Sequence, residues 1–208
     1  MVSAKDYLKN PCGAASIPYW KLAHVTLPKD MQIVHGADFR EELLQGYVDE
    51  PYFRLIHHLS VAPVAAPAGY SLCRPPVEDF ASHISECYAC NMTTDEVRSF
   101  TQRAVYCPEL WLALRNDKTG QIVATGIGEL DRQIGEGILE WIQVSPAYRG
   151  RGLGSYVVKQ LLWRMKDMAD FATVSGQCNN PFAPERLYRG CGFTGGDVWH
   201  ILRRKSQT

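Results

Sequence analysis

The sequence predicts an α/β (α+β) fold, in which one mixed β-sheet is flanked by helices, and two observations predict it. Beyond residue 70 the hydrophobic pattern gives the order strand, two helices, three strands, helix, strand, helix, strand. In addition, a hydrophobic strand that ends at Val144 leads through a glycine-rich loop into a helix over 153–168. Interleaved strands and helices of this kind are typical of a sheet covered by helices.

The first 65 residues are predicted to form an N-terminal extension that packs on a main domain over residues 66–208. Within the extension the sequence predicts short helices over 38–47 and 51–59, and a linker over 61–69 that is rich in alanine and proline. The extension has few regular elements but several aromatic residues. We therefore expect it to pack on a second surface or to line a pocket, and not to fold as a separate domain.

The main domain begins with a strand and two helices. Apolar residues recur at spacings of three and four over 76–88, which predicts a helix. Thr93 and Glu96 have the spacing of a capping box, which predicts the start of a second helix. The segments 121–131 and 135–144 predict an antiparallel pair. The remaining predicted elements are strands over 70–75, 111–115, 171–176 and 198–203 and a short helix over 183–189.

The composition excludes several classes of protein. The 208 residues are 46% hydrophobic and 21% charged, as in ordinary globular chains long enough to bury a core. Because the formal net charge is zero, nucleic-acid binding is disfavoured. No apolar run is long enough for a membrane span, and the N-terminus lacks the apolar segment of a signal peptide. We therefore expect a cytoplasmic protein without nucleic-acid or membrane partners.

The seven cysteines do not form an obvious disulfide framework. Cys87 and Cys90 are the only close pair, and His83 would lie one turn before Cys87 on a helix. A His/Cys/Cys metal site or a redox pair is conceivable on this spacing, but no second pair completes a metal site. We favour reduced structural thiols and expect no metal.

The loop between Val144 and Ser155 has the features of a phosphate cradle. It offers three glycines, two arginines and the backbone N–H groups of a helix N-terminus, where the helix dipole favours an anion. A P-loop would end in Gly-Lys-Ser/Thr, which is absent. In the dinucleotide fingerprint a third glycine would occupy the position of Ser155, and too few residues follow for that domain.

The pattern that does fit is Arg-x-x-Gly-x-Gly, formed by Arg149, Gly152 and Gly154 after the hydrophobic strand. It resembles motif A of the GNAT superfamily of acyl-CoA-dependent N-acetyltransferases. The segment from Arg186 to Phe193 is similar to the family's Leu-Tyr-x-x-x-Gly-Phe segment, and is preceded by the matching residues Asn180 and Ala183. Two departures are an extra residue before Tyr188 and a proline at position 184. The resemblance is specific over 121–195 and does not cover the first sixty residues.

The resemblance implies a sheet that splays open beside motif A, where acetyl-CoA inserts its pantetheine arm like an added strand. It implies acetyl-CoA as cosubstrate and an amine acceptor, either a small molecule or a peptide; a homodimer stays open. The residues expected to bind the cofactor are Ile142, Gln143, Val144, Arg149, Gly150, Arg151, Gly152, Leu153, Gly154, Ser155 and Asn180.

The chemistry of acetyl transfer needs a base for the amine and an acid for the departing thiolate. Strand alternation would place Glu140 on one face with Ile138, Ile142 and Val144, so that it would be an acid among apolar neighbours. Glu140 is therefore one candidate base, with Glu129 as the second candidate. Tyr188 matches the family tyrosine that protonates the thiolate. A non-catalytic acyl-CoA sensor that kept motif A remains the alternative.

Overall fold

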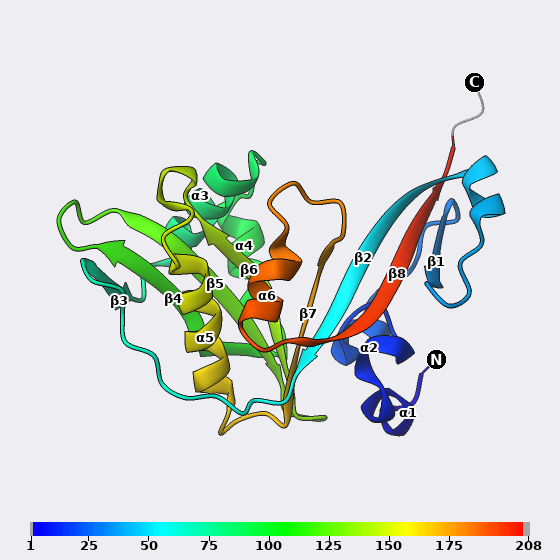
Figure 1. Cartoon of the computed structure of the whole chain (residues 1–208), viewed down its shortest axis with the longest axis horizontal. Helices are drawn as coiled ribbons and strands as arrows, with labels where there is room; N and C mark the ends of the chain where they lie inside the picture. The colour runs from blue at the N-terminus through cyan, green and yellow to red at the C-terminus, as the bar shows by residue number, and fades with distance from the viewer. Residues whose placement is uncertain (1, 206–208) are drawn as a thin grey trace. The chain divides into compact units, whose positions relative to one another are not determined.

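The computed structural model describes residues 2–205, and the chain forms two compact units (Figure 1). One unit comprises Met1–His57 with Thr173–Thr208, and the other comprises His58–Ala172. Both units combine strands with helices, so the predicted α/β (α+β) class is confirmed.

The unit His58–Ala172 contains four strands in the order β6-β5-β4-β3. All three neighbouring pairs are antiparallel. The predicted hairpin over 121–144 is confirmed, while the strand predicted over 111–115 is longer than expected because it starts at Tyr106. The bounds of the strands are β3 Tyr70–Cys73, β4 Tyr106–Asn116, β5 Ile122–Asp131 and β6 Glu136–Val144.

Helix α5 (Leu153–Met165) packs along one face of β4, β5 and β6 (Figure 1). Glycines in the strands permit this close approach. A Cβ atom on Gly126 would lie 2.5 Å from Val157 Cγ1, and one on Gly137 would lie 2.7 Å from Met165 Sδ. Side chains of α5 therefore pack directly on the backbone of the strands, and this close packing positions the N-terminus of α5 relative to the sheet.

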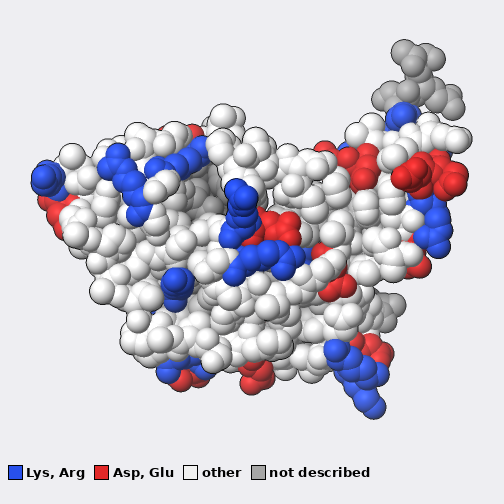
Figure 2. Space-filling view, in the orientation of Figure 1, with Lys and Arg blue, Asp and Glu red and all other residues white. Residues whose placement is uncertain are grey.

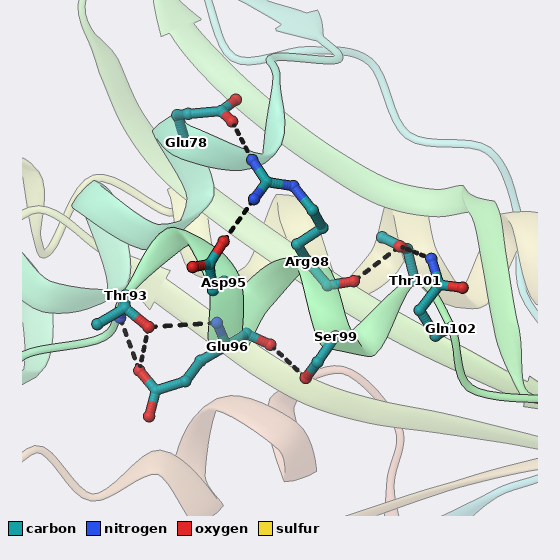
Figure 3. Close-up of polar contacts among 8 residues, drawn as sticks. All are labelled: Glu78, Thr93, Asp95, Glu96, Arg98, Ser99, Thr101 and Gln102. Atoms are coloured by element: carbon teal, nitrogen blue, oxygen red, sulfur yellow. Dashed lines mark hydrogen bonds and ion pairs between the residues drawn. The ribbon is translucent and has the colours of Figure 1, made fainter.

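Helices α3 (Val77–Tyr88) and α4 (Thr94–Phe100) pack on the other side of this sheet. The predicted capping box is present, since Thr93 Oγ1 accepts from the Glu96 N–H and the Glu96 carboxylate accepts from the Thr93 N–H (Figure 3). Arg98 joins the two helices by donating to Glu78 at 2.9 Å. The core between helices and sheet contains Phe80, Ala81, Ile84, Val97, Trp111 and Ile127.

Strand β6 contains a β-bulge at Glu140. Leu139 lies opposite Gly128 and Trp141 lies opposite Ile127, so Glu140 is the extra residue of the bulge. The bulge breaks the alternation of side chains along β6. Ile142 lies beside Gly126 on the face that α5 covers, whereas Trp141 packs in the core beneath α3. The sequence-based expectation that Glu140 shares one face with Ile138, Ile142 and Val144 is therefore wrong.

The unit formed by the two ends of the chain contains strands in the order β1-β8-β2-β7. Strand β8 pairs antiparallel with both β1 and β2. The helix predicted over 51–59 is wrong, because these residues belong to strand β2, where Pro51 lies opposite His200. The bounds are β1 Met31–His35, β2 Tyr47–His57, β7 Phe171–Gln177 and β8 Thr194–Arg204.

The helices of this unit are short. The helix predicted over 38–47 is reduced to the 3₁₀ turn η2 (Glu41–Gln45). The buried Arg54 of β2 donates to Tyr7 Oη at 2.7 Å and to Ser175 Oγ at 3.1 Å, which ties the first helix and β7 to the sheet. The other helices are α1 Ala4–Lys9, α2 Pro11–Ala14, the 3₁₀ turn η1 Tyr19–Ala23 and α6 Pro184–Gly190.

The surface carries charges of both signs. On the face shown in Figure 2, Lys and Arg side chains are interspersed with Asp and Glu, in keeping with the formal net charge of zero. Among the described residues, no helix is both long enough and apolar enough to cross a membrane.

Candidate active site

The glycine-rich loop follows β6 directly and turns the chain into α5. A single 3₁₀ turn, η3 (Pro146–Tyr148), leads into Gly150 and Gly152, which have φ angles of 75° and 78°. Only glycine adopts this left-handed conformation without strain. No atom lies within 4 Å of the place that a Cβ would take at either glycine, so the backbone is open to a ligand.

The N-terminus of α5 is suited to bind an anion. Gly152 caps the helix and supplies no side-chain hydrogen bond to it. The first N–H groups of an α-helix have no acceptor within the helix, and the dipole of a 13-residue helix places partial positive charge there. Leu153, Gly154 and Ser155 form this first turn. The open glycines and the first turn of α5 together have the geometry that suits a phosphate, and we call this segment the phosphate cradle.

The two arginines of the loop have different roles in the structure. Arg149 faces inward: its Nε donates to the Val144 carbonyl at 3.2 Å, and its Nη2 donates to the Cys87 carbonyl at 3.5 Å. Arg151 is exposed, donates to the Ala147 carbonyl at 3.1 Å, and lies over the ring of Tyr148. Arg149 therefore shapes the loop, whereas Arg151 can swing toward a bound phosphate.

The end of β6 presents backbone groups on the side away from β5, just before this loop. The Ser145 N–H donates to the Val123 carbonyl of the neighbouring strand at 2.9 Å. Because inward and outward residues alternate in an antiparallel ladder, Gln143 also directs its backbone toward β5. Ile142 and Val144 consequently direct their N–H and C=O groups away from β5. An extended ligand can pair with these two residues in the manner of an added strand.

The two acidic candidates differ in their surroundings. Glu129 is buried and paired with Arg103, whose Nη1 lies 2.6 Å from Glu129 Oε1. Glu140 sits at the bulge and is partly exposed. Both lie in the same unit as the phosphate cradle. The two carboxylates thus differ in burial: Glu129 is buried in an ion pair, and Glu140 is partly exposed at the bulge.

A buried polar network supports the start of the loop from beneath. His83 of α3 forms hydrogen bonds with Thr125 Oγ1 at 2.8 Å and with Ser145 Oγ at 2.9 Å, and Gln143 donates to the same threonine. Burial of His83 lowers its pKa, which favours the neutral ring. The side chain of Gln143 is therefore engaged inside the protein, and its Oε1 is buried without a hydrogen-bond partner.

The Cys87–Cys90 pair does not form a metal centre with His83. Cys87 Sγ lies 3.6 Å from His83 Nε2, as expected one turn apart, but that nitrogen also binds Ser145. Burial raises the pKa of Cys87 to about 11, so its thiol stays protonated at neutral pH. Among residues 2–205 no group of three or more His, Cys, Asp or Glu side chains could hold a metal ion.

Tyr188 and Asn180 lie in the unit formed by the chain ends. Tyr188 belongs to α6, is buried, and packs with its ring 5.8 Å from that of Phe193 and 6.1 Å from that of Phe53. Asn180 precedes the helix and accepts a hydrogen bond from the Phe182 N–H at 2.9 Å. Pro184 occupies the first turn of α6, where a proline is tolerated, so it does not interrupt the helix.

The family model for the acetyltransferase (GNAT) domain matches residues 108–195. The segment 108–195, somewhat less than half of the chain, is thus similar to a GNAT acetyltransferase domain. The match covers the β4–β6 strands, the phosphate cradle and α6. No curated protein sequence matches the chain.

Solved structures of GNAT proteins share the fold. A GCN5-related N-acetyltransferase from Sphaerobacter thermophilus is 20% identical, with a TM-score of 0.68 over 90% of this chain and 65% of that one. A GNAT acetyltransferase from Colwellia psychrerythraea is 14% identical, with a TM-score of 0.62 over 83% and 64% of the two chains. The chain thus spans slightly less than two thirds of either protein.

Sequence reasoning missed three residues of this candidate site. Arg103 pairs with Glu129, His83 supports the cradle, and Tyr88 donates to the Ile142 carbonyl at 3.3 Å. Tyr88 belongs to the apolar stripe of α3, so the sequence indicated only that its side chain packs against the sheet. The spacing of His83 and Cys87 correctly placed both side chains on one face of α3. The partners of His83, Thr125 on β5 and Ser145 in the loop, are brought to it only by tertiary packing.

Proposed function

We propose that this protein is an N-acetyltransferase that transfers the acetyl group of acetyl-CoA to a primary amine by direct attack in a ternary complex. The observation that carries the proposal is the continuity of two features in one segment. The outward backbone of Ile142 and Val144 is followed by the glycine-rich loop and by the N-terminus of α5, which has no side-chain cap. The first feature suits the pantetheine arm and the second suits the pyrophosphate.

In the proposed reaction the neutral amine nitrogen attacks the thioester carbonyl carbon, and the carbon–sulfur bond then breaks. The nitrogen loses a proton to a base and the departing thiolate takes one from an acid. An outward N–H of β6 stabilises the negative charge that develops on the carbonyl oxygen. A lysine-like amine has a pKa of about 10.4 and is mostly protonated at neutral pH, so a base that accepts its proton lowers the cost of forming the neutral nucleophile.

Glu140 is the base we favour, with Glu129 as the alternative. Glu140 lies at the bulge and is partly exposed, whereas Glu129 is buried, so an acceptor amine can reach Glu140 more readily. Tyr188 is the proposed acid, because a phenol stays protonated at neutral pH and can donate to a thiolate.

We further propose roles for the residues around the cofactor and the acceptor. Residues 149–155 would hold the pyrophosphate, with Gln143 and Asn180 placed to support the cofactor-binding segments. Residues 1–65 would serve the acceptor side, and the acceptor would be a small-molecule or peptide amine. We propose a cytoplasmic protein without a metal cofactor.

The test is release of free thiol from acetyl-CoA in the presence of a mixed panel of amines. We expect amine-dependent release of coenzyme A, with acetylated product identified by mass spectrometry. Tight binding of coenzyme A without thiol release across the panel would instead favour a non-catalytic sensor. A protein that neither binds coenzyme A nor releases thiol would contradict both functions.

A further inference from the structure

The outward carbonyls of β6 are already occupied by side chains of the protein itself. Val144 and Ile142 direct their backbone groups away from β5. Arg149 Nε donates to the Val144 carbonyl, and Tyr88 Oη donates to the Ile142 carbonyl at 3.3 Å. A ligand whose N–H group is to donate to the Ile142 carbonyl therefore finds that carbonyl already bound to the Tyr88 hydroxyl.

Several contacts place Tyr88 over this edge. Tyr88 is the last residue of α3, and its ring lies edge-on to Trp141 of β6, with centroids 5.4 Å apart. The same end of α3 is fastened to the loop through the Cys87 carbonyl, which accepts from Arg149. Ala89 then ends the helix in the left-handed conformation with a φ of 50°, a strained geometry for alanine.

The hydroxyl of Tyr88 is held loosely. A distance of 3.3 Å is longer than the usual 2.7–2.8 Å of an O–H···O hydrogen bond, and about half of the side chain is exposed. Burial of part of the ring raises the pKa of Tyr88, which keeps its proton available for donation at neutral pH. A ligand can therefore displace the hydroxyl into solvent without leaving a buried polar group unpaired.

We propose that Tyr88 is a specificity-determining residue of the cofactor edge: its hydroxyl occupies the Ile142 carbonyl in the free protein, and the pantetheine arm must displace it to bind. The inference rests on the proposed function, because it assumes that the arm of acyl-CoA pairs with β6. Tyr88 would thereby reduce the affinity for ligands that pair with Ile142, while it leaves phosphate binding at α5 unaffected.

The test compares two ligands by calorimetry on the full chain. Coenzyme A carries the pantetheine arm, whereas adenosine 3′,5′-bisphosphate has the nucleotide without the arm. Tyr88→Phe keeps the ring on Trp141 and removes only the hydroxyl. We expect this variant to bind coenzyme A about two- to tenfold more tightly than wild type, the range of one net hydrogen bond, with adenosine 3′,5′-bisphosphate unchanged.

Tyr106→Phe is the matched control, since Tyr106 lies on the same side of the sheet with its ring 5.6 Å from Trp111. It should leave the affinity for both ligands unchanged. Equal or weaker coenzyme A binding in Tyr88→Phe, or tightening of both ligands alike, would overturn the role of Tyr88. Failure of the proposed function looks different, because wild type itself would then either bind no coenzyme A or bind it without amine-dependent release of thiol.

Discussion

At the scale of single residues, Gly152 tests the phosphate cradle. It caps α5 with a φ of 78°, and the space beside it is open. Gly152→Asp would bring a negative charge to the place proposed for pyrophosphate, while Gly152→Asn has a similar size, tolerates the left-handed conformation and stays neutral. We expect calorimetry to show coenzyme A binding at least about tenfold weaker in the aspartate variant than in the asparagine variant. Equal affinities in the two folded variants would argue against an anion at this site.

Tyr188 tests the proposed acid. Its ring is packed beside Phe193, so Tyr188→Phe should keep the packing and remove only the hydroxyl. We expect kcat to fall by about 10²–10⁴-fold, the range for a lost proton transfer, with little change in coenzyme A affinity. Steady-state kinetics and calorimetry measure the two effects separately. Wild-type turnover in the variant would limit Tyr188 to packing.

Glu140 tests the proposed base. Glu140→Gln should reduce kcat/KM most at low pH, where little of the acceptor amine is neutral, and rising pH should partly restore the rate. The pH–rate profile of Glu129→Gln provides the matched comparison. If only the Glu129 variant shows the pH-dependent loss, the base assignment moves to that residue and its ion pair with Arg103 must open during the reaction.

At the scale of elements, His83 fastens α3 to β5 and to the loop after β6. Burial lowers its native pKa below the ordinary 6.5, so the unfolded chain binds this proton at a higher pH than the native protein does. The stabilisation from neutral His83 is fully present above about pH 6.5 and is lost as the pH falls below it. One proton limits the change to about 1.4 kcal/mol per pH unit.

We therefore expect the free energy of unfolding in urea to fall between about pH 7.5 and 5.5, and to fall less in His83→Gln, which cannot titrate. The glutamine variant should also be less stable at pH 7.5, because it holds Thr125 and Ser145 less well. An identical pH dependence in both proteins would show that His83 is not the titrating group.

The elements with local signals were predictable from the sequence, and those defined by distant partners were not. The capping box of Thr93 and the β5–β6 hairpin depend on neighbouring residues and are confirmed. The bulge at Glu140 depends on register, which the strand pattern alone does not reveal. Residues 51–57 form a short apolar run with a proline, which fits a helix start or a strand equally well; their partner β8 lies some 140 residues later in the chain.

The site shows the same division. The glycines and arginines of the loop lie within one short segment, so the glycine-rich connection between β6 and α5 could be predicted from spacing alone. Tyr88 and Arg103 reach the site from α3 and from the segment after α4, and only the packing of these helices on the sheet brings them to Ile142 and Glu129. Side chains of this kind have no sequence spacing to mark them.

At the scale of the whole molecule, the N-terminal segment is built into a sheet. Within the unit Met1–His57 with Thr173–Thr208, β2 pairs with β8 from Tyr47 to Ile56 and lies between β8 and β7. Strand β1 covers the other edge of β8. Removal of both strands would leave β8 without either neighbour and expose buried side chains such as Leu202.

Deletion of residues 1–60 is therefore expected to yield a protein that is insoluble or has lost most of its stability, as sedimentation and thermal unfolding would show. The phosphate cradle belongs to His58–Ala172, so any soluble fraction should still bind coenzyme A but with an impaired KM for the acceptor. Co-expression of residues 1–57 as a separate chain provides the control, since restored strands should restore solubility. A truncated protein that is soluble, stable and kinetically unchanged toward its acceptor would show that neither β1 nor β2 is needed for the fold or for the acceptor side.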